Sequence, residues 1–244
     1  MATSKLLNQY MEPLIGGRRR ECRALVQDAI SKGSTARSLY QDLIWPAMDR
    51  VEQMYRDDRI NQATEHLATR INRVVADHLQ TSLRQNEVLG KRVLITCAHG
   101  EPEELGAQMC SDLFEAEGWD VYLLGGGVPD DEVLMLVGQL QPELLLIIGS
   151  QPIDAPAVRQ MIDQIREIGS CPTMNVMVSG GVFNRAADLW KEVKADLFAA
   201  TAVEALVLAS SATPRKPEIR MEGAPKKRRR RRRPPLLVQA EGQA

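Results

Sequence analysis

The N-terminal third of the chain has apolar residues at the spacing of amphipathic helices. Up to about residue 85 they recur every three or four positions, which gathers them on one face of a helix. The stripe over residues 39–54 contains Pro46, where we expect a kink, and the next stripe follows Asn61, a predicted helix cap. With a weaker first segment at residues 6–14, the pattern predicts a bundle of about four helices over residues 1–88.

From about Lys91 the pattern changes to short apolar runs that alternate with helical segments. Runs of this kind are typical of strands buried on both faces, so the region predicts an α/β domain with a doubly wound parallel sheet. We assign this Rossmann-like domain to residues 89–213 and expect its five strands at residues 93–95, 121–124, 144–148, 174–178 and 197–199. Helices are expected between the strands, the last two at residues 186–193 and 202–210.

The formal charge of −1 hides a strong asymmetry along the chain. Residues 214–244 hold eleven Lys and Arg against three Glu, a net charge of +8, so that residues 1–213 carry −9. Prolines and a lack of apolar residues predict that this Arg-rich tail is disordered. Its eight consecutive cations, residues 226–233, are suited to non-specific binding of nucleic acid, anionic lipid or another acidic surface, including the acidic part of the same chain.

Composition and motifs exclude several classes of protein. The longest apolar runs are far shorter than the roughly 20 residues that cross a bilayer, and the first ten residues lack a signal-peptide pattern, so we expect a cytoplasmic protein without a membrane span. The four cysteines have no zinc-ligand spacing. The first strand is followed neither by the GxGxxG motif of dinucleotide sites nor by a P-loop. No catalytic Ser-His-Asp or Cys-His pattern is readable, and we expect no enzyme.

Glycine-bearing loops follow four of the predicted strands. They are residues 98–106, 125–129, 149–152 and 179–182. In a parallel sheet, ligands bind beyond the carboxyl ends of the strands, and glycine lets a ligand approach the backbone closely. Any one of these loops is explained as a tight turn, but all of them at one edge predict a site for a large, flat-sided ligand.

The order and spacing of these loops resemble those of a known family. The segment GEPEELG at residues 100–106, then SQP at 150–152 and Gly180-Gly181, resembles the DxHxxG…SxL…GG signature of base-off cobalamin-binding domains. The helical half resembles the cap of light-sensing, cobalamin-dependent transcription regulators, which carry a Trp, nine residues and then Glu-His. Here Tyr55 is followed by nine residues and then Glu65-His66. The resemblance covers roughly residues 10–210.

This resemblance implies that cap and sheet sandwich a corrin ring while the nucleotide tail of the cofactor enters the sheet domain. It would place Ser150 and the Gly180-Gly181 pair at the tail, residues 125–128 at the ring edge, and Tyr55, Glu65 and His66 at the upper face. The full set of cofactor-binding candidates is Tyr55, Glu65, His66, Gly100, Glu101, Pro102, Glu103, Glu104, Leu105, Gly106, Gly125, Gly126, Gly127, Val128, Ser150, Gln151, Pro152, Ser179, Gly180, Gly181 and Val182.

Two positions depart from the family pattern. The lower cobalt ligand, the His of DxHxxG, falls on Glu103, and a carboxylate is a harder and weaker partner for cobalt than imidazole. The cap Trp falls on Tyr55, which keeps an aromatic face with less area. Corrin binding survives both losses through ring and tail contacts, whereas chemistry that needs a tuned lower imidazole is disfavoured. Glu101 and Glu104 are also explained as acids that stabilise a helix start.

Three histidines remain as metal-ligand candidates. His66 is preferred, because the neighbouring Glu65 can orient its ring; the alternative is a histidine that packs at the bundle–sheet interface. His99 precedes Glu103 by four residues and is an alternative lower ligand, or else a solvated loop residue. His78 continues an apolar stripe and is expected at the core or its boundary.

The leading hypothesis is a non-enzymatic cobalamin-binding sensor, with a light response implied by the resemblance alone, that acts in gene regulation through a partner protein. One alternative is a sensor of haem or another tetrapyrrole, bound through His66 and stacked on Tyr55. Another is a corrinoid carrier subunit of a methyltransferase system, which Glu103 disfavours. The last is an interaction scaffold without a cofactor. An oligomer is compatible with each.

Overall fold

The computed structural model describes residues 2–98 and 104–217. The candidates His99, Gly100, Glu101, Pro102 and Glu103 lie outside the described residues, as does the tail from residue 218 onward. What was predicted for them therefore stays a prediction.

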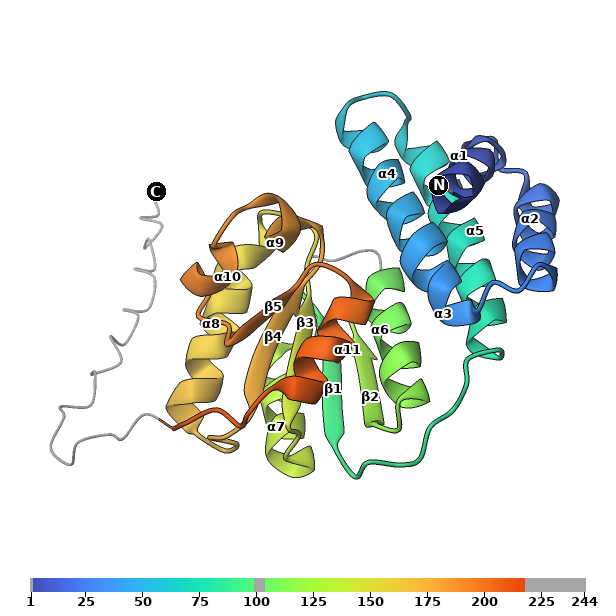
Figure 1. Cartoon of the computed structure of the whole chain (residues 1–244). Coiled ribbons are helices and arrows are strands. Elements are labelled where there is room, and N and C mark those ends of the chain that lie inside the picture. Colours follow the sequence, from blue (N-terminus) through green and yellow to red (C-terminus); the bar gives the residue numbers. More distant parts are fainter. Residues whose placement is uncertain (1, 99–103, 218–244) are drawn as a thin grey trace, which may run out of the picture.

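The first region is the predicted helical bundle (Figure 1). Its elements are α1 (Ala2–Ile15), α2 (Arg19–Ser31), α3 (Ala36–Leu39), the π-helical turn η1 (Tyr40–Ile44), α4 (Trp45–Arg56) and α5 (Gln62–Gln80). Because α3, η1 and α4 follow one another without a break, the chain makes four helical segments, as predicted. The cap predicted for the last segment is also present, since the side chain of Asn61 accepts a hydrogen bond from the Thr64 N–H.

A π-helical turn lies directly before Pro46, where a kink was expected. The Trp45 N–H bonds to the carbonyl of Tyr40, five residues back instead of four. A proline ring has no N–H and crowds the carbonyl four residues earlier, here that of Asp42. A widened turn just before the proline relieves this conflict and lets the helical segment continue.

One histidine differs from its expected position in the bundle. α5 buries a continuous apolar face that includes Ile71, Val75 and Leu79. His78, which the stripe predicted at the core or its boundary, is exposed. It lies immediately before Leu79 on the helix, about 100° around the axis from it, and the buried stripe is too narrow to include it.

The second region is a parallel five-stranded sheet in the order β2-β1-β3-β4-β5, which confirms the predicted fold class. The strands are β1 (Arg92–Cys97), β2 (Asp120–Gly125), β3 (Leu144–Ile148), β4 (Asn175–Ser179) and β5 (Leu197–Ala199). The helices are α6 (Leu105–Ala116), α7 (Asp130–Leu140), α8 (Asp154–Ile168), α9 (Gly181–Arg185), α10 (Leu189–Glu192) and α11 (Ala202–Ser211).

The helix expected at residues 186–193 is wrong. Two short helices replace it: α9, whose first residue is Gly181 of the glycine pair, and α10, which begins four positions after the end of α9. Ala186 is extended and Asp188 is left-handed, with φ of 63°, so the backbone between them cannot continue one helix. α9 therefore begins at the glycine loop, and its last residue lies close to the sheet edge.

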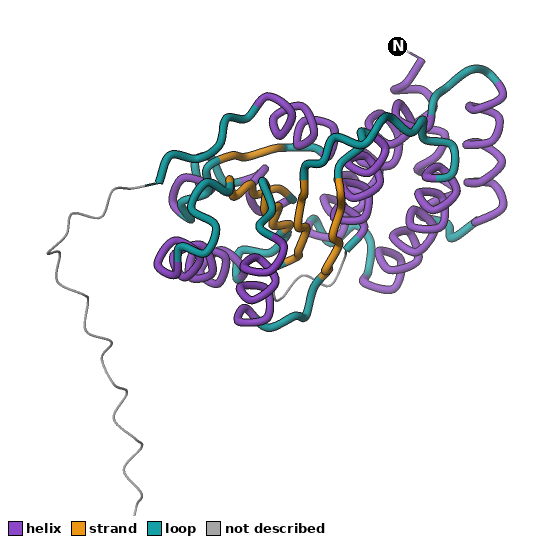
Figure 2. Tube along the Cα trace, turned by 90° about the horizontal axis from the view of Figure 1, so that it is seen from below, coloured by secondary structure: helices purple, strands orange, loops and turns teal. Residues whose placement is uncertain are grey.

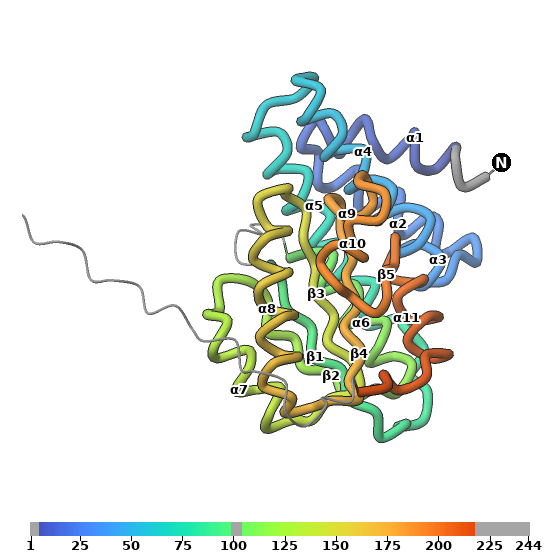
Figure 3. The backbone as a smooth tube through the Cα atoms, turned by 90° about the vertical axis from the view of Figure 1, so that its left-hand side faces the viewer, coloured from blue at the N-terminus to red at the C-terminus, as the bar shows by residue number. Residues whose placement is uncertain are grey.

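Alternate residues of the strands face two different layers. Val93, Ile95 and Leu146 belong to a core that includes α6, α11 and the bundle, whereas Leu94 and Ile147 pack with α7 and α8 on the opposite face. Figures 2 and 3 show helices on both faces of the strands, with the bundle at one side of the sheet domain. The bundle therefore extends the apolar layer on one face of the sheet.

Polar contacts also join the bundle to α6 and its end. Arg37 of the bundle pairs with Glu117 at 2.5 Å, and Asp77 of α5 accepts a hydrogen bond from Gln108 of α6. The connecting residues 81–91 run along the turn after α6, where the Leu89 N–H bonds to the Gly118 carbonyl. These contacts position α4 and α5 beside the carboxyl ends of the strands. Within the described part of the chain, no helix is long and apolar enough to cross a membrane.

Candidate functional site

A cleft of about 770 Å³ lies between the bundle and the carboxyl edge of the sheet. α4 and α5 form one wall. The start of α6, the loop after β3 and the turn from β4 into α9 form the other. This volume is in the range of sites for small molecules and cofactors. The cleft is therefore the candidate site.

Ten of the residues predicted from the sequence line this one cleft. They are Tyr55, Glu65, His66, Leu105, Gly106, Ser150, Gln151, Pro152, Gly180 and Gly181. The candidates from the cap and those from the loops after β3 and β4 thus share one continuous space. Tyr55 and Gly181, for example, are 126 positions apart in the chain.

The other described candidates do not line the cleft. They are Glu104, Gly125, Gly126, Gly127, Val128, Ser179 and Val182. Glu104 instead accepts a hydrogen bond from the Gly126 N–H at 2.7 Å and so ties the start of α6 to the loop after β2. Ser179 and Val182 are buried under the sheet edge. Their assignment to the cofactor, like that of the ring-edge glycines, stays a prediction.

Two glycines stand in the sheet-side wall of the cleft. Gly180 has a φ of 103°, and a Cβ there would collide with the backbone of Gly149, so only glycine fits. Gly106 presents no side chain where a Cβ would lie 3.8 Å from both Trp45 and Ile148. A larger side chain at this position would extend into the cleft.

Sequence reasoning missed a polar set on α4 and α9. Asp49, Glu52 and Arg56 line the cleft from α4, and Arg185 faces them from α9. The spacing of the three α4 residues places them along one face of the helix. In the sequence, this polar face beside an apolar stripe could have pointed to these residues. However, a polar helix face that lines a cleft has the same pattern as one that faces solvent.

An ion pair crosses the cleft from cap to sheet. Arg185 Nη1 lies 2.6 Å from Glu52 Oε1, and Arg185 Nη2 donates to the backbone carbonyl of Ser150 at 2.5 Å. Arg56 lies 3.8 Å from the same Glu52 oxygen. Asp49 remains accessible to solvent, but partial desolvation by the surrounding protein raises the pKa of its carboxyl to about 6. The negative charge of Glu52 raises this pKa further. The cleft therefore holds a set of paired charges.

The candidate metal ligand lies on the cap wall. His66 Nε2 is 3.6 Å from Glu65 Oε2, and Thr69 donates to the other oxygen of Glu65 at 3.2 Å. The His66 side chain is about half exposed, at 49%, and so is open to a ligand in the cleft. Among residues 2–98 and 104–217, no three His, Cys, Asp or Glu side chains form a group that could hold an ion. The role of His66 as a metal ligand stays a prediction.

Trp45 contributes a buried aromatic ring to the wall of the cleft. It lines the cleft and is 5% exposed, and its indole N–H has no hydrogen-bond partner in the described structure. A buried donor without a partner costs free energy. With Tyr55, Trp45 gives the cleft aromatic surface.

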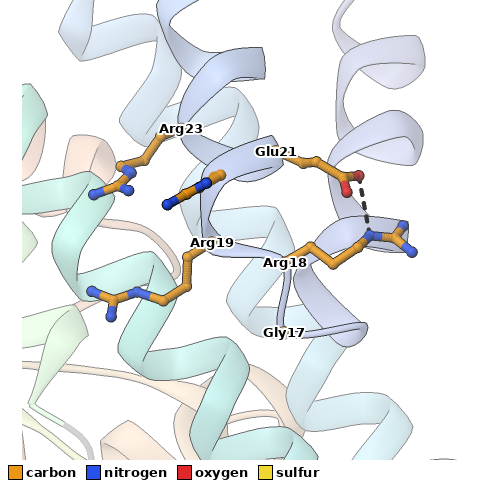
Figure 4. Close-up of a pocket in the computed structure, with 6 residues that line it drawn as sticks. Gly17, Arg18, Arg19, Glu21 and Arg23 are labelled. Carbon is orange, nitrogen blue, oxygen red and sulfur yellow. Dashed lines mark ion pairs between the residues drawn. The ribbon is translucent and has the colours of Figure 1, made fainter.

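A second hollow, of about 490 Å³, lies at the turn between α1 and α2. Figure 4 shows Arg19 and Arg23 extended to one side, while Arg18 turns to the other and pairs with Glu21 at 3.1 Å. Its lining comes from residues 17–23 alone. Unlike the cleft, this hollow brings no distant parts of the chain together.

Comparison with known families agrees with the geometry of the cleft. Two models, each described as a B12 binding domain, match residues 6–80 and 91–208. The chain belongs to the B12-binding domain family. The matches cover the bundle and the sheet separately, and together about four fifths of the chain. They confirm the predicted family in its general form, with B12 and not haem as the ligand that both descriptions name.

Solved structures of corrinoid proteins are similar to this chain. The monomethylamine corrinoid protein of Methanosarcina barkeri shares its fold, with a TM-score of 0.73 and 17% identity over 84% of this chain and 97% of that one. A cobalamin-binding protein of Desulfitobacterium hafniense matches at a TM-score of 0.47, with 18% identity over 84% and 97% of the two chains. The methanol:cobalamin methyltransferase complex MtaBC of Methanosarcina barkeri also matches at 0.47, with 19% identity over 86% and 81%. No curated protein matches the chain.

Proposed function

We propose that this protein holds a cobalamin in the cleft for use by a partner protein and is not itself a catalyst. One observation carries the proposal: His66 on the cap side and Ser150 with Gly180-Gly181 on the sheet side line a single cleft. The family resemblance assigns these residues to the upper face and to the nucleotide tail of the cofactor. Their meeting in one space is what a bound cobalamin requires.

The residues of the cleft would divide the work of binding. The glycines admit the tail close to the backbone, and Trp45 with Tyr55 provides aromatic surface for the ring. His66, oriented by Glu65, would offer an imidazole nitrogen to the metal. The bound group would supply a cobalt that exchanges an axial ligand, and the chain would orient it and shield it from water.

The first candidate use is carriage of a methyl group. The similarity to a monomethylamine corrinoid protein over 97% of that chain favours this alternative above a light sensor. A carrier must expose the upper face of the corrin to a partner enzyme. The cleft between two walls, joined by a few polar contacts, allows such an opening.

The second candidate use is regulation. It is favoured by His66, because a cap histidine on cobalt would make the position of the cap depend on the state of the cofactor. A partner that reads the position of the cap would then respond to cobalamin. The light response and the role in gene regulation remain part of this second candidate.

Absorption spectra of the purified protein after gel filtration test the proposal. We expect one equivalent of cobalamin to co-elute with protein that was mixed with hydroxocobalamin, methylcobalamin or adenosylcobalamin. Uptake of haem alone would instead favour the alternative that the cleft binds haem or another tetrapyrrole. Failure to retain any of these ligands would leave a scaffold without a cofactor and would end the proposal.

The two uses are separated with the loaded protein. A carrier, reduced with titanium(III) and treated with iodomethane, should regain the methylcobalamin spectrum and keep its cofactor through gel filtration. A regulator, loaded with adenosylcobalamin and illuminated, should change its hydrodynamic radius or its state of assembly. If remethylation does not occur, the protein is not a methyl carrier. If illumination changes neither the radius nor the assembly, the regulatory use is excluded.

A further inference from the structure

We propose that Arg185 binds the phosphate of the cofactor's nucleotide tail and that Glu52 occupies its guanidinium when the tail is absent. This inference rests on the proposed function and adds to it a residue that selects the complete cofactor. Cobalamin carries a phosphodiester in its tail, whereas cobinamide has the same ring without the nucleotide. The two ligands therefore differ by one negative charge near the tail site.

Arg185 lies where the tail candidates meet. It is the last residue of α9, four positions after Gly181, and its Nη2 donates to the carbonyl of Ser150 at 2.5 Å. Its Nη1 lies 2.6 Å from Glu52 Oε1 on α4. One guanidinium thus touches the loop after β3, the turn after β4 and the cap.

The Glu52–Arg185 pair fills the space directly above Gly181. A Cβ built on Gly181 would lie 2.7 Å from Glu52 Oε2 and would also collide with Arg185 Nη1. This is the surface along which the resemblance places the tail. A tail that packs on Gly181 cannot share that space with both side chains, so the pair must open when the tail enters.

When the pair opens, a phosphate can replace the Glu52 carboxylate as the anionic partner of Arg185. Arg185 is 29% exposed, and losing the Glu52 carboxylate without a substitute would leave a partly buried cation unpaired. Guanidinium and phosphate match in a two-point, charge-assisted contact. Glu52 keeps a partner as well, because Arg56 Nε already lies 3.8 Å from its Oε1. The exchange therefore leaves both Arg185 and Glu52 with a partner of opposite charge.

The same exchange links the tail to the cap. In the structure described, Glu52–Arg185 is an ion pair between α4 of the bundle and α9 of the sheet region. A phosphate that takes Arg185 would remove this tie, while a ligand without a phosphate would leave it in place. Tail binding would thereby loosen one contact that holds the cap over the cleft.

Titration of four proteins with cobalamin and cobinamide tests the inference. Absorbance or calorimetric titration would compare the wild type with R185Q, E52Q and the control R159Q, whose arginine pairs with Asp163 on α8 outside the cleft. R185Q should weaken cobalamin binding on the order of tenfold to a hundredfold and leave cobinamide binding within about twofold. E52Q should strengthen cobalamin binding several-fold, because a competitor and a like charge are removed. R159Q should change neither.

The outcomes distinguish this inference from the proposed function. Equal weakening of both ligands by R185Q, or weakening of cobalamin binding by E52Q, would overturn the role of Arg185 as a phosphate ligand. A wild-type protein that binds neither ligand would instead refute the proposed function. Should R185Q not fold, R185K retains the charge without the two-point contact, and its loss of affinity should again be confined to cobalamin; a loss shared by cobinamide would overturn the inference.

Discussion

The hydroxyl of Tyr40 in the bundle lies 2.8 Å from Oδ2 of Asp112 on α6 and 2.9 Å from the carbonyl of Ala76. Tyr40 and Asp112 are both buried. A phenol has one proton and cannot donate to both acceptors at once. A protonated Asp112 resolves the conflict, since it donates to Tyr40 while Tyr40 donates to Ala76. Burial raises the pKa of Asp112 to about 6, which favours this arrangement in mildly acidic solution.

Stability should therefore fall as the pH rises through the titration of Asp112. The folded state holds this proton up to about pH 6, whereas an unfolded aspartate releases it near pH 4, so the contribution is complete below about pH 4 and lost above pH 6. We expect a decrease of about 3 kcal/mol in the unfolding free energy from this group. D112N, which stays neutral and can donate to Tyr40, should reduce the slope between pH 4 and 6 in urea unfolding and leave the part that Asp49 contributes.

The matched control is Asp163, where Lys194 and Arg159 hold the pKa of the carboxyl below its usual value. Its contribution changes at lower pH, so D163N should keep the slope of the wild type between pH 4 and 6. A D112N protein with the same slope would show that Asp112 does not carry the effect.

The fold was readable from sequence where burial alone determines local structure. β3 was predicted with its correct bounds because residues 144–148 are all buried, and a fully covered strand is a continuous apolar run. The helix expected at residues 202–210 also matches α11 to within one residue at its C-terminal end. The helix at residues 186–193 failed because a left-handed Asp188 leaves no signal in the apolar pattern.

The site was only partly readable, because much of it comes from pairing across the fold. His66, Ser150 and the glycine pair were found through motif spacing, and they line the cleft. Glu52 and Arg185 are 133 positions apart and form their contact only when α4 meets α9. No local pattern in either segment specifies that meeting. Such pairs follow from topology, which places the bundle over the carboxyl edge of the sheet.

Replacement of Gly180 should destabilise the fold even without a ligand. Its φ of 103° disfavours any side chain, and a Cβ would collide with the Gly149 backbone. We expect G180A to lower the unfolding free energy by about 1–3 kcal/mol in urea denaturation. G138A, in helix α7 with only ordinary contacts around the added Cβ, should be neutral or raise stability by up to about 1 kcal/mol. If G180A were as stable as G138A, the backbone at the sheet edge would differ from that described.

Gly106 offers a way to fill the cleft without strain. A Cβ there would lie 3.8 Å from Trp45 and Ile148, an ordinary contact, so G106A should fold and bind cobalamin. G106L should place its branched end in the cleft and weaken cobalamin binding at least about tenfold, with a melting temperature close to that of G106A. Calorimetric titration and thermal unfolding measure the two quantities. Unimpaired binding by G106L would mean that the cofactor does not use this part of the cleft.

The final prediction concerns His66 as an axial ligand. In the wild type, the imidazole of His66 should displace water from aquocobalamin and shift the absorption bands of the cofactor. Glu65, whose Oε2 lies 3.6 Å from His66 Nε2, would orient the imidazole at the wall of the cleft. H66A should bind with the spectrum of free aquocobalamin, and E65Q should retain the shift with a weaker affinity. H78A removes an exposed histidine of the same helix outside the cleft and should behave as the wild type. If H66A and the wild type gave the same bound spectrum, the cobalt would take its ligand from elsewhere. His66 would then serve only in packing, and the regulatory use would lose the contact by which the cap senses the metal.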